Sequence, residues 1–253
     1  MPTRLELEHH LELISKAGLA LGERARQAGE TAPVPTCPRW TVTDLVGHIG
    51  MVHRWARANL LGDPDGSTRA WKEEAATVPD RLAWLGTGVG DLVATLREVP
   101  DDTKAMVFLR DAPSPRRFWA RRQAHETTIH SVDALAAVLG RVPSTDEAGI
   151  PPEVAEDGVD ELVCGFLPRG KGKPRFDGVD RLRISAADTG RSWTMHYTDD
   201  EVTTVPDDNA PADATISGTA VQLYLGLWNR GAELDGPEEI LTGWQKQARV
   251  RWS

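Results

Sequence analysis

The sequence predicts an α+β protein in which a four-helix bundle precedes a smaller domain of strands and helices. Apolar residues recur at steps of three and four along four segments of the first half, as on the buried face of a helix. After Gly140 the pattern changes to short strand-like segments separated by turn residues. We therefore expect a bundle over residues 1–145 and an α+β domain over residues 150–253.

The first three helices are indicated by apolar faces and by end signals. Residues 7–28 carry one apolar face, and the helix is expected to end near Gly29. Thr41-Val-Thr-Asp44 is a capping box, in which two side chains bond each other's backbone N–H groups, and it opens a second helix that ends near Gly62. A third periodic segment lies between residues 80 and 99.

The fourth helix has the clearest ends. Ser114 is expected to accept a hydrogen bond from a first-turn N–H, Pro115 suits the first position, and Gly140 suits a left-handed stop. Glu126 and His130 are four residues apart, so their side chains leave the same face. They can share one divalent metal ion if another helix supplies a third ligand. Three protein ligands and an open position form the catalytic type of zinc site.

The second half begins with a turn-rich linker over residues 142–152. A short helix is expected from Glu153 to Phe166, and helical spacing returns from Thr219 to Trp228. Between these helices, period-two patterns bounded by turn residues predict strands at residues 182–186, 192–197, 201–205 and 212–217. Mixed strands and helices in this order predict an α+β domain.

Composition excludes several classes of protein. The chain has 253 residues, of which 40% are hydrophobic and 26% charged, as in a globular protein. Its net charge of −9 argues against nucleic acid as a partner. There is no signal peptide and no membrane-spanning run, so we expect a cytoplasmic protein without a membrane partner. Cys37 and Cys164 are too few for a disulfide framework.

Two histidines of the second helix compete for the third ligand position. His48 and His53 lie on opposite edges of its apolar stripe, and periodicity alone does not choose between them. His125 lies inside the apolar centre of the fourth helix, so it is either a rival ligand or a buried neutral histidine bonded to a carbonyl. The gap of five between His125 and His130 excludes the zinc-protease motif, which spaces its histidines by four. Trp40, Trp55 and Trp119 flank these segments, and we expect each to be buried, with the lining of a pocket as the alternative.

Four segments resemble the mycothiol-dependent maleylpyruvate isomerase family, in the same order and with similar spacing. They are Val34–Trp55, Glu126–Asp133, Glu156–Leu162 and Ala214–Arg230. The resemblance implies a DinB-like four-helix bundle joined to a small α+β domain similar to sterol carrier proteins. It covers nearly the whole chain.

The resemblance implies a ligand set of His48, Glu126 and His130. Zinc is the expected ion, and two imidazoles with one carboxylate also suit nickel or iron. Asp133, one turn beyond His130, is expected either to support that ligand or to be a solvated carboxylate. Arg230 is expected either to bind an anionic group of the substrate or to cap a helix end. No acid–base residue is assigned.

The resemblance also implies that the cosubstrate is the thiol mycothiol. Its thiolate would add to an activated cis double bond, allow rotation and leave, or would be transferred to a small, acidic electrophile. We therefore expect a metal-dependent isomerase or S-transferase that acts as a monomer or homodimer. The alternatives are a non-catalytic metal- or ligand-binding module of the DinB-like superfamily and a hydrolase that uses metal-bound water.

Overall fold

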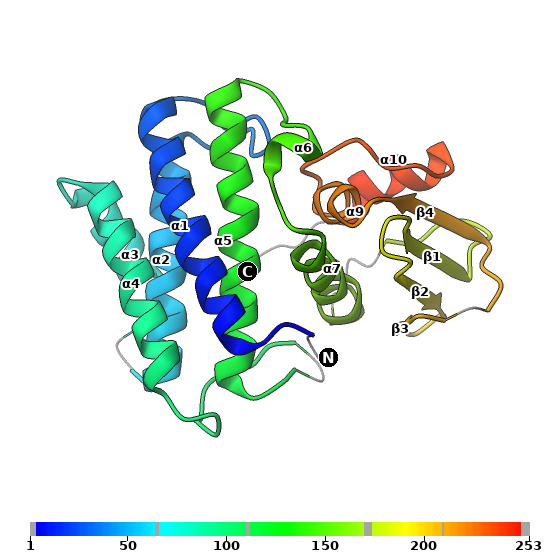
Figure 1. Cartoon of the computed structure of the whole chain (residues 1–253), viewed down its shortest axis with the longest axis horizontal. Coiled ribbons are helices and arrows are strands. Elements are labelled where there is room, and N and C mark those ends of the chain that lie inside the picture. The colour runs from blue at the N-terminus through cyan, green and yellow to red at the C-terminus, as the bar shows by residue number, and fades with distance from the viewer. Residues whose placement is uncertain (1–3, 64–65, 110–111, 170–173, 209, 249–253) are drawn as a thin grey trace.

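The first half of the protein is helical. The computed structural model describes residues 4–63, 66–109, 112–169, 174–208 and 210–248. Its first five helices are α1 (Leu7–Ala28), α2 (Val42–Leu61), α3 (Thr68–Thr77), α4 (Arg81–Glu98) and α5 (Pro115–Leu139). The long helices α1, α2, α4 and α5 pack side by side as the predicted bundle (Figure 1). Helix α3 packs against α2 and was not predicted.

Most of the predicted helix ends are confirmed. Thr41 and Asp44 form both bonds of the capping box. Gly62 and Gly140 adopt left-handed conformations, with φ of 65° and 67°. The predicted cap at Ser114 is wrong, because no N–H donates to its side chain. Pro115 at the next position fixes the helical φ without help from a side-chain cap.

Helix α5 lies at the centre of the molecule. Every residue from Phe118 to Ala134 is buried, because α1 and α2 cover one side of the helix and elements beyond residue 150 cover the other. Its buried surface therefore includes charged and polar side chains as well as apolar ones. Buried ionisable groups need partners, so the contacts of these side chains locate the chemistry of the chain.

The second half is the predicted mixture of helices and strands. Its helices are α6 (Thr145–Ala148), α7 (Pro152–Asp160), the π-helix η1 (Glu161–Phe166), α8 (Leu167–Arg169), α9 (Ala220–Leu227) and α10 (Glu238–Gln247). Its strands are β1 (Arg181–Ala186), β2 (Ser192–Tyr197), β3 (Val202–Pro206) and β4 (Ala214–Gly218). All four strands lie within two residues of their predicted bounds. Helix α10 was not predicted.

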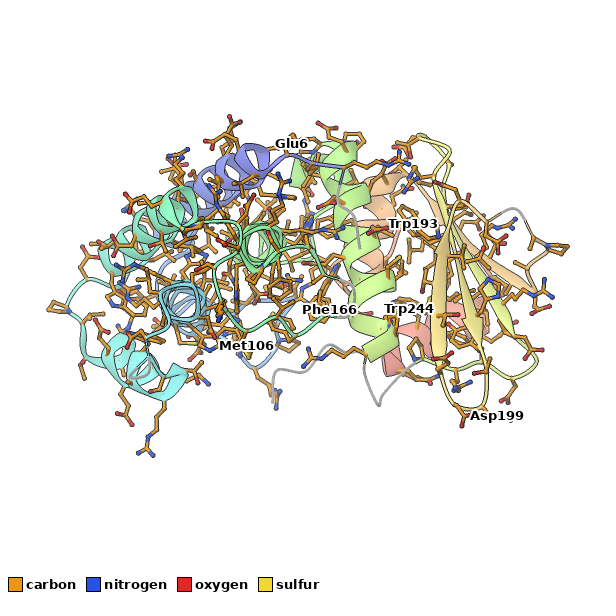
Figure 2. The ribbon with its side chains drawn as sticks, turned by 90° about the horizontal axis from the view of Figure 1, so that it is seen from below. Glu6, Met106, Phe166, Trp193, Asp199 and Trp244 are labelled. Carbon is orange, nitrogen blue, oxygen red and sulfur yellow. The ribbon has the colours of Figure 1, made fainter. Side chains whose placement is uncertain are left out.

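The strands form one sheet in the order β3-β2-β1-β4. β1 is antiparallel to β2 and parallel to β4, and β2 is antiparallel to β3. Alternate residues of β1 and β2, including Ile184, Trp193 and Met195, are fully buried on one face. Helices α7 and α9 lie between this sheet and the bundle, so the molecule has three layers (Figures 1 and 2).

The two halves share one contiguous apolar core. Trp193 of β2 donates from Nε1 to Asp160 of α7, at 3.0 Å. Gly158 of α7 lies directly against the ring of Tyr224 in α9, since a Cβ built there would be 2.2 Å from a ring carbon. The domain boundary at residues 145–150 stays a prediction. None of the helices in the described parts of the chain is long and apolar enough to cross a membrane.

Candidate metal centre

The three residues expected to bind a metal lie together. Helix α5 contributes Glu126 and His130 from one face, and α2 contributes His48. Nε2 of His48 is 3.2 Å from Oε1 of Glu126, and Nε2 of His130 is 3.4 Å from the same oxygen. One ligand atom of each residue lies within 4.8 Å of the other two. We call these residues the metal group.

The spacing of these atoms fits a metal ion. Zinc binds nitrogen and oxygen at about 2.0–2.2 Å, so neighbouring ligands of a tetrahedral ion are about 3.4 Å apart. The two measured contacts to Glu126 are 3.2 and 3.4 Å. Two imidazole nitrogens and one carboxylate oxygen are also a donor set that zinc, nickel and iron accept. The residues present therefore fit the ion that the family resemblance implies.

The metal group is largely enclosed, and burial competes with hydrogen bonding in setting its charges. The side chain of His48 is 16% exposed, whereas those of His130 and Glu126 are 8% and 5% exposed. Burial acts to raise the pKa of Glu126, but hydrogen bonds with His130 and His48 hold that pKa well below its ordinary value. Burial lowers the pKa of His48. Burial also acts to lower the pKa of His130, but its contacts with Asp133 and Glu126 raise that pKa to about 9. Without a metal ion, the group therefore holds a carboxylate at Glu126, a neutral imidazole at His48 and a protonated imidazole at His130, and a bound metal ion would displace the proton of His130.

Trp40 forms a wall of the metal group. Its ring stacks on that of His130, with centroids 5.6 Å apart and planes 21° apart, and its centroid is 4.9 Å from that of His48. Trp119 is fully buried as expected, while Trp40 and Trp55 are only half-buried. The expectation of burial is therefore wrong for Trp40 and Trp55, and Trp40 instead contacts both histidines.

Asp133 lies behind His130. Its Oδ2 is 2.8 Å from Nδ1 of His130, and its side chain is fully buried. The alternative of a solvated carboxylate is therefore wrong. Burial acts to raise the pKa of Asp133, but the charge of Arg230 and the contact with His130 hold it far below its ordinary value. Asp133 is thus a buried anion that contacts the outer nitrogen of His130, while the inner nitrogen faces the metal group.

Arg230 is bonded within the chain. Its Nε and Nη2 each donate to one oxygen of Asp133 at 3.0 Å, and Nη1 donates to the carbonyl of Trp228. Cys37 also contacts this pair, since its Sγ lies 3.4 Å from Asp133 and 3.3 Å from Arg230. Burial and the charge of Asp133 raise the pKa of the Cys37 thiol to about 12. A protonated thiol in this position agrees with a structural role for Cys37.

The two competing histidines point elsewhere. His53 is fully buried, and its Nε2 lies 2.9 Å from the hydroxyl of Thr127, so it is not part of the metal group. His125 is fully buried, but the predicted carbonyl partner is wrong. Its Nε2 is 2.8 Å from Oδ2 of Asp157, and its Nδ1 is 3.1 Å from the hydroxyl of Tyr224.

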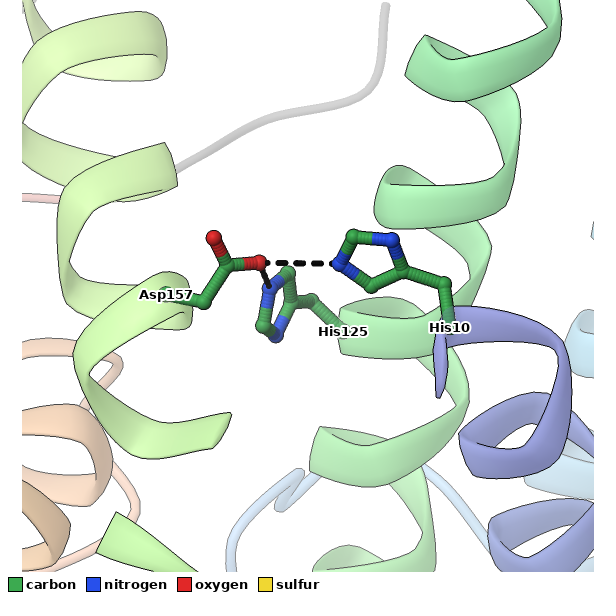
Figure 3. A group of neighbouring side chains, drawn as sticks. All are labelled: His10, His125 and Asp157. Carbon is green, nitrogen blue, oxygen red and sulfur yellow. Dashed lines mark hydrogen bonds and ion pairs between the residues drawn. The ribbon is translucent and has the colours of Figure 1, made fainter. Parts of the chain in front are cut away.

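His125 belongs to a second group of similar composition, with His10 and Asp157 (Figure 3). Nε2 of His10 is 3.1 Å from the same Oδ2 of Asp157. Nε of Arg121 donates to this oxygen as well, at 3.0 Å, and Nη2 reaches the other oxygen at 2.9 Å. Oδ2 therefore already has three N–H partners, and we interpret this Asp157 cluster as a buried hydrogen-bond network that joins α1, α5 and α7.

Sequence reasoning missed residues whose partners lie far along the chain. His10 and Arg121 were not singled out, although they bind Asp157. Arg122 was also missed, although it contacts Glu126 from one turn away on α5. The spacing of four between Arg122, Glu126 and His130 is a signal that would have placed all three on one helix face.

Comparisons with known proteins agree with the fold of the chain. The model of the "Mycothiol maleylpyruvate isomerase N-terminal domain" matches residues 11–135, and that of the "MDMPI C-terminal domain" matches residues 153–248. A crystal structure of the mycothiol-dependent maleylpyruvate isomerase superposes with a TM-score of 0.64 at 16% identity, covering 94% of this chain and 97% of that one. A histidine-to-alanine mutant of that enzyme gives 0.63 at 15% identity, with the same coverage. The search of curated protein sequences found no significant match.

Proposed function

The chain belongs to the mycothiol-dependent maleylpyruvate isomerase family, and from this premise we propose that it is a thiol-dependent isomerase or S-transferase with a divalent metal at His48, Glu126 and His130. The observation that carries the proposal is the convergence of one atom from each of these residues, on two helices, within 4.8 Å. Zinc is the ion we propose first, and nickel and iron suit the same donors.

A divalent ion in this group would supply positive charge that favours the thiolate form of a bound thiol at neutral pH. The chain's own residues hold and orient the donors. Asp133 contacts Nδ1 of His130 and fixes the ring, so that Nε2, which lies 3.4 Å from Oε1 of Glu126, faces the metal group. Trp40 packs against both imidazole rings and so helps to hold them in place.

We propose mycothiol as the cosubstrate and a small, acidic electrophile as the substrate. In the isomerisation, a carbon–sulfur bond forms as the thiolate adds to the activated cis double bond, which becomes a single bond. Rotation about this carbon–carbon bond follows. The carbon–sulfur bond then breaks, which releases the thiolate and the trans isomer. In S-transfer the carbon–sulfur bond is kept, and the carbanion formed by the addition takes up the proton that the thiol released. Both reactions need the thiol, whereas a hydrolase does not.

A substrate-binding role for Arg230 stays part of the proposal, under a constraint from the structure. Two of its guanidinium nitrogens are bonded to Asp133 and the third to a carbonyl. A substrate anion would therefore have to share Arg230 with Asp133. We propose that the pair also helps to hold His130, and that the protein acts in the cytoplasm as a monomer or homodimer.

The test is turnover with and without added thiol. Purified protein is incubated with maleylpyruvate, or with a small electrophile, in the presence and absence of mycothiol, and the products are followed by chromatography. Thiol-dependent product that is lost in His48→Ala and kept in His9→Ala supports the proposal, since His9 is a half-buried histidine of α1 outside the metal group. Turnover without thiol would indicate a hydrolase, and binding without turnover a non-catalytic module.

A further inference from the structure

The oxygen of Glu126 that faces away from the histidines has a partner of its own. Nη2 of Arg122 lies 3.2 Å from Oε2 of Glu126, whereas Oε1 contacts the two imidazoles of the metal group. Nη1 of Arg122 donates to Oε2 of Glu161, the first residue of η1. Arg122 and Glu161 are each only 1% exposed. One guanidinium therefore joins a carboxylate of the metal group to a carboxylate of the second half.

Aromatic rings complete the surroundings of Arg122. Its guanidinium carbon lies 4.9 Å from the ring centroid of Phe166 and 5.6 Å from that of Trp228. A cation within about 6 Å of an aromatic face is attracted to that face. Glu161, Phe166 and Trp228 all lie beyond residue 150. The second half of the chain thus determines where the Arg122 side chain points.

This arrangement has two consequences for Glu126. With Oε2 bonded to Arg122, the carboxylate presents only Oε1 to the histidines. The carboxylates of Glu126 and Glu161 also carry one more formal negative charge than Arg122 balances. A guanidinium can donate in parallel from two nitrogens, which a lysine ammonium does not reproduce. Both the orientation of Glu126 and the excess of negative charge favour a cation beside Oε1, either a bound metal ion or the protonated imidazole of His130, whose Nε2 lies 3.4 Å away.

We propose that Arg122 and Glu161 form a clamp that orients Glu126 as a one-oxygen metal ligand, so that the second half of the chain sets the geometry of a metal group carried by the bundle. The inference rests on the proposed role of His48, Glu126 and His130 as ligands. Arg122 and Glu161 are positioning residues. They act through Glu126 and touch no reacting atom.

The test measures metal binding directly. Wild type, Arg122→Lys, Glu161→Gln and the control Glu153→Gln are stripped of metal, and their affinities for Zn²⁺ are measured by competition with a chromophoric chelator. Arg122→Lys keeps the charge and removes the two-pronged contact, while Glu161→Gln keeps the shape and removes the charge. Glu153 is exposed on α7. Residues that orient metal ligands typically contribute 10- to 100-fold in affinity, so we expect each clamp variant to bind Zn²⁺ about 10- to 100-fold more weakly and the control to match wild type.

A spectroscopic measurement separates orientation from general damage. The visible absorption of bound Co²⁺ depends on how many oxygens Glu126 contributes, so the clamp variants should change the band intensity while circular dichroism stays that of the wild type. Clamp variants that match the affinity and the Co²⁺ spectrum of wild type would overturn the inference. Wild type that binds neither Zn²⁺ nor Co²⁺ would instead overturn the proposed function. If one clamp variant does not fold, the other decides the result.

Discussion

Replacing Asp157 with asparagine should strongly destabilise the fold, because this carboxylate connects α7 to the bundle. It lies within 3.1 Å of N–H groups of His10, His125 and Arg121. Asparagine keeps one oxygen and removes the charge, which leaves the buried Arg121 without its main partner. Breaking a buried ion pair costs about 3–5 kcal/mol. Arg121 keeps Asp160 at 3.1 Å and a main-chain carbonyl at 2.7 Å. We therefore expect a loss near the lower end, about 3 kcal/mol.

The free energy of unfolding is measured by urea titration at pH 7, with Glu153→Gln as the exposed control on the same helix. Burial acts to raise the pKa of Asp157, but hydrogen bonds from His10 and His125 and the charge of Arg121 hold it well below its ordinary value. A carboxylate with a depressed pKa stabilises fully above about pH 4 and loses this contribution as the pH falls further. The difference between Asp157→Asn and wild type should therefore shrink below pH 4. If the free energies of unfolding of Asp157→Asn and wild type differ by less than about 1 kcal/mol at pH 7, the reasoning is refuted. A difference that disappears when EDTA is added would also refute it, because the Asp157 cluster would then owe its stability to a bound metal ion.

Three further changes test other parts of the structure. Burial lowers the pKa of His53 to about 3, so this histidine should reduce the free energy of unfolding of wild type by about 1.4 kcal/mol per pH unit as the pH falls below 6.5. In urea unfolding between pH 7 and pH 5, His53→Gln should therefore lose about 2 kcal/mol less stability than wild type. Equal losses in the two proteins would contradict the burial of a neutral His53. Gly158→Ala should lower the free energy of unfolding by about 1–2 kcal/mol, because its Cβ would meet the ring of Tyr224 at 2.2 Å; an unchanged or higher melting temperature would argue against this contact. Asp133→Asn should weaken Zn²⁺ binding about 10- to 100-fold in chelator competition, because it removes the anion that orients His130; wild-type affinity would show that the contact is dispensable.

Local signals account for the parts of the fold that the sequence predicted. The capping box at Thr41–Asp44 and the left-handed stop at Gly140 depend only on nearby residues, and both form as expected. Helix α3 was missed because only Ala75 of its residues is buried, so it has no apolar stripe. Helix α10 buries only Ile240 and Trp244, which is too short a pattern to detect.

The metal group could be predicted only in part. Glu126 and His130 follow from the spacing of four on one helix, but the choice between His48 and His53 depends on how α2 is rotated against α5. That rotation results from packing between segments more than 70 residues apart. The same limit applies to Glu161, whose contact with Arg122 spans 39 residues. A helix pattern also could not reveal that the partner of His125 is a carboxylate of α7.

The most direct test of the proposed metal centre is metal analysis of the purified protein by inductively coupled plasma mass spectrometry. Wild type and the His48→Ala, Glu126→Gln and His130→Ala variants are compared, with His53→Gln as a folded control whose histidine lies outside the metal group. We expect about one equivalent of a divalent metal in wild type and in the control, and a strong loss in each of the three variants while circular dichroism is retained. Variants that fold and keep their metal would contradict the assignment of His48, Glu126 and His130.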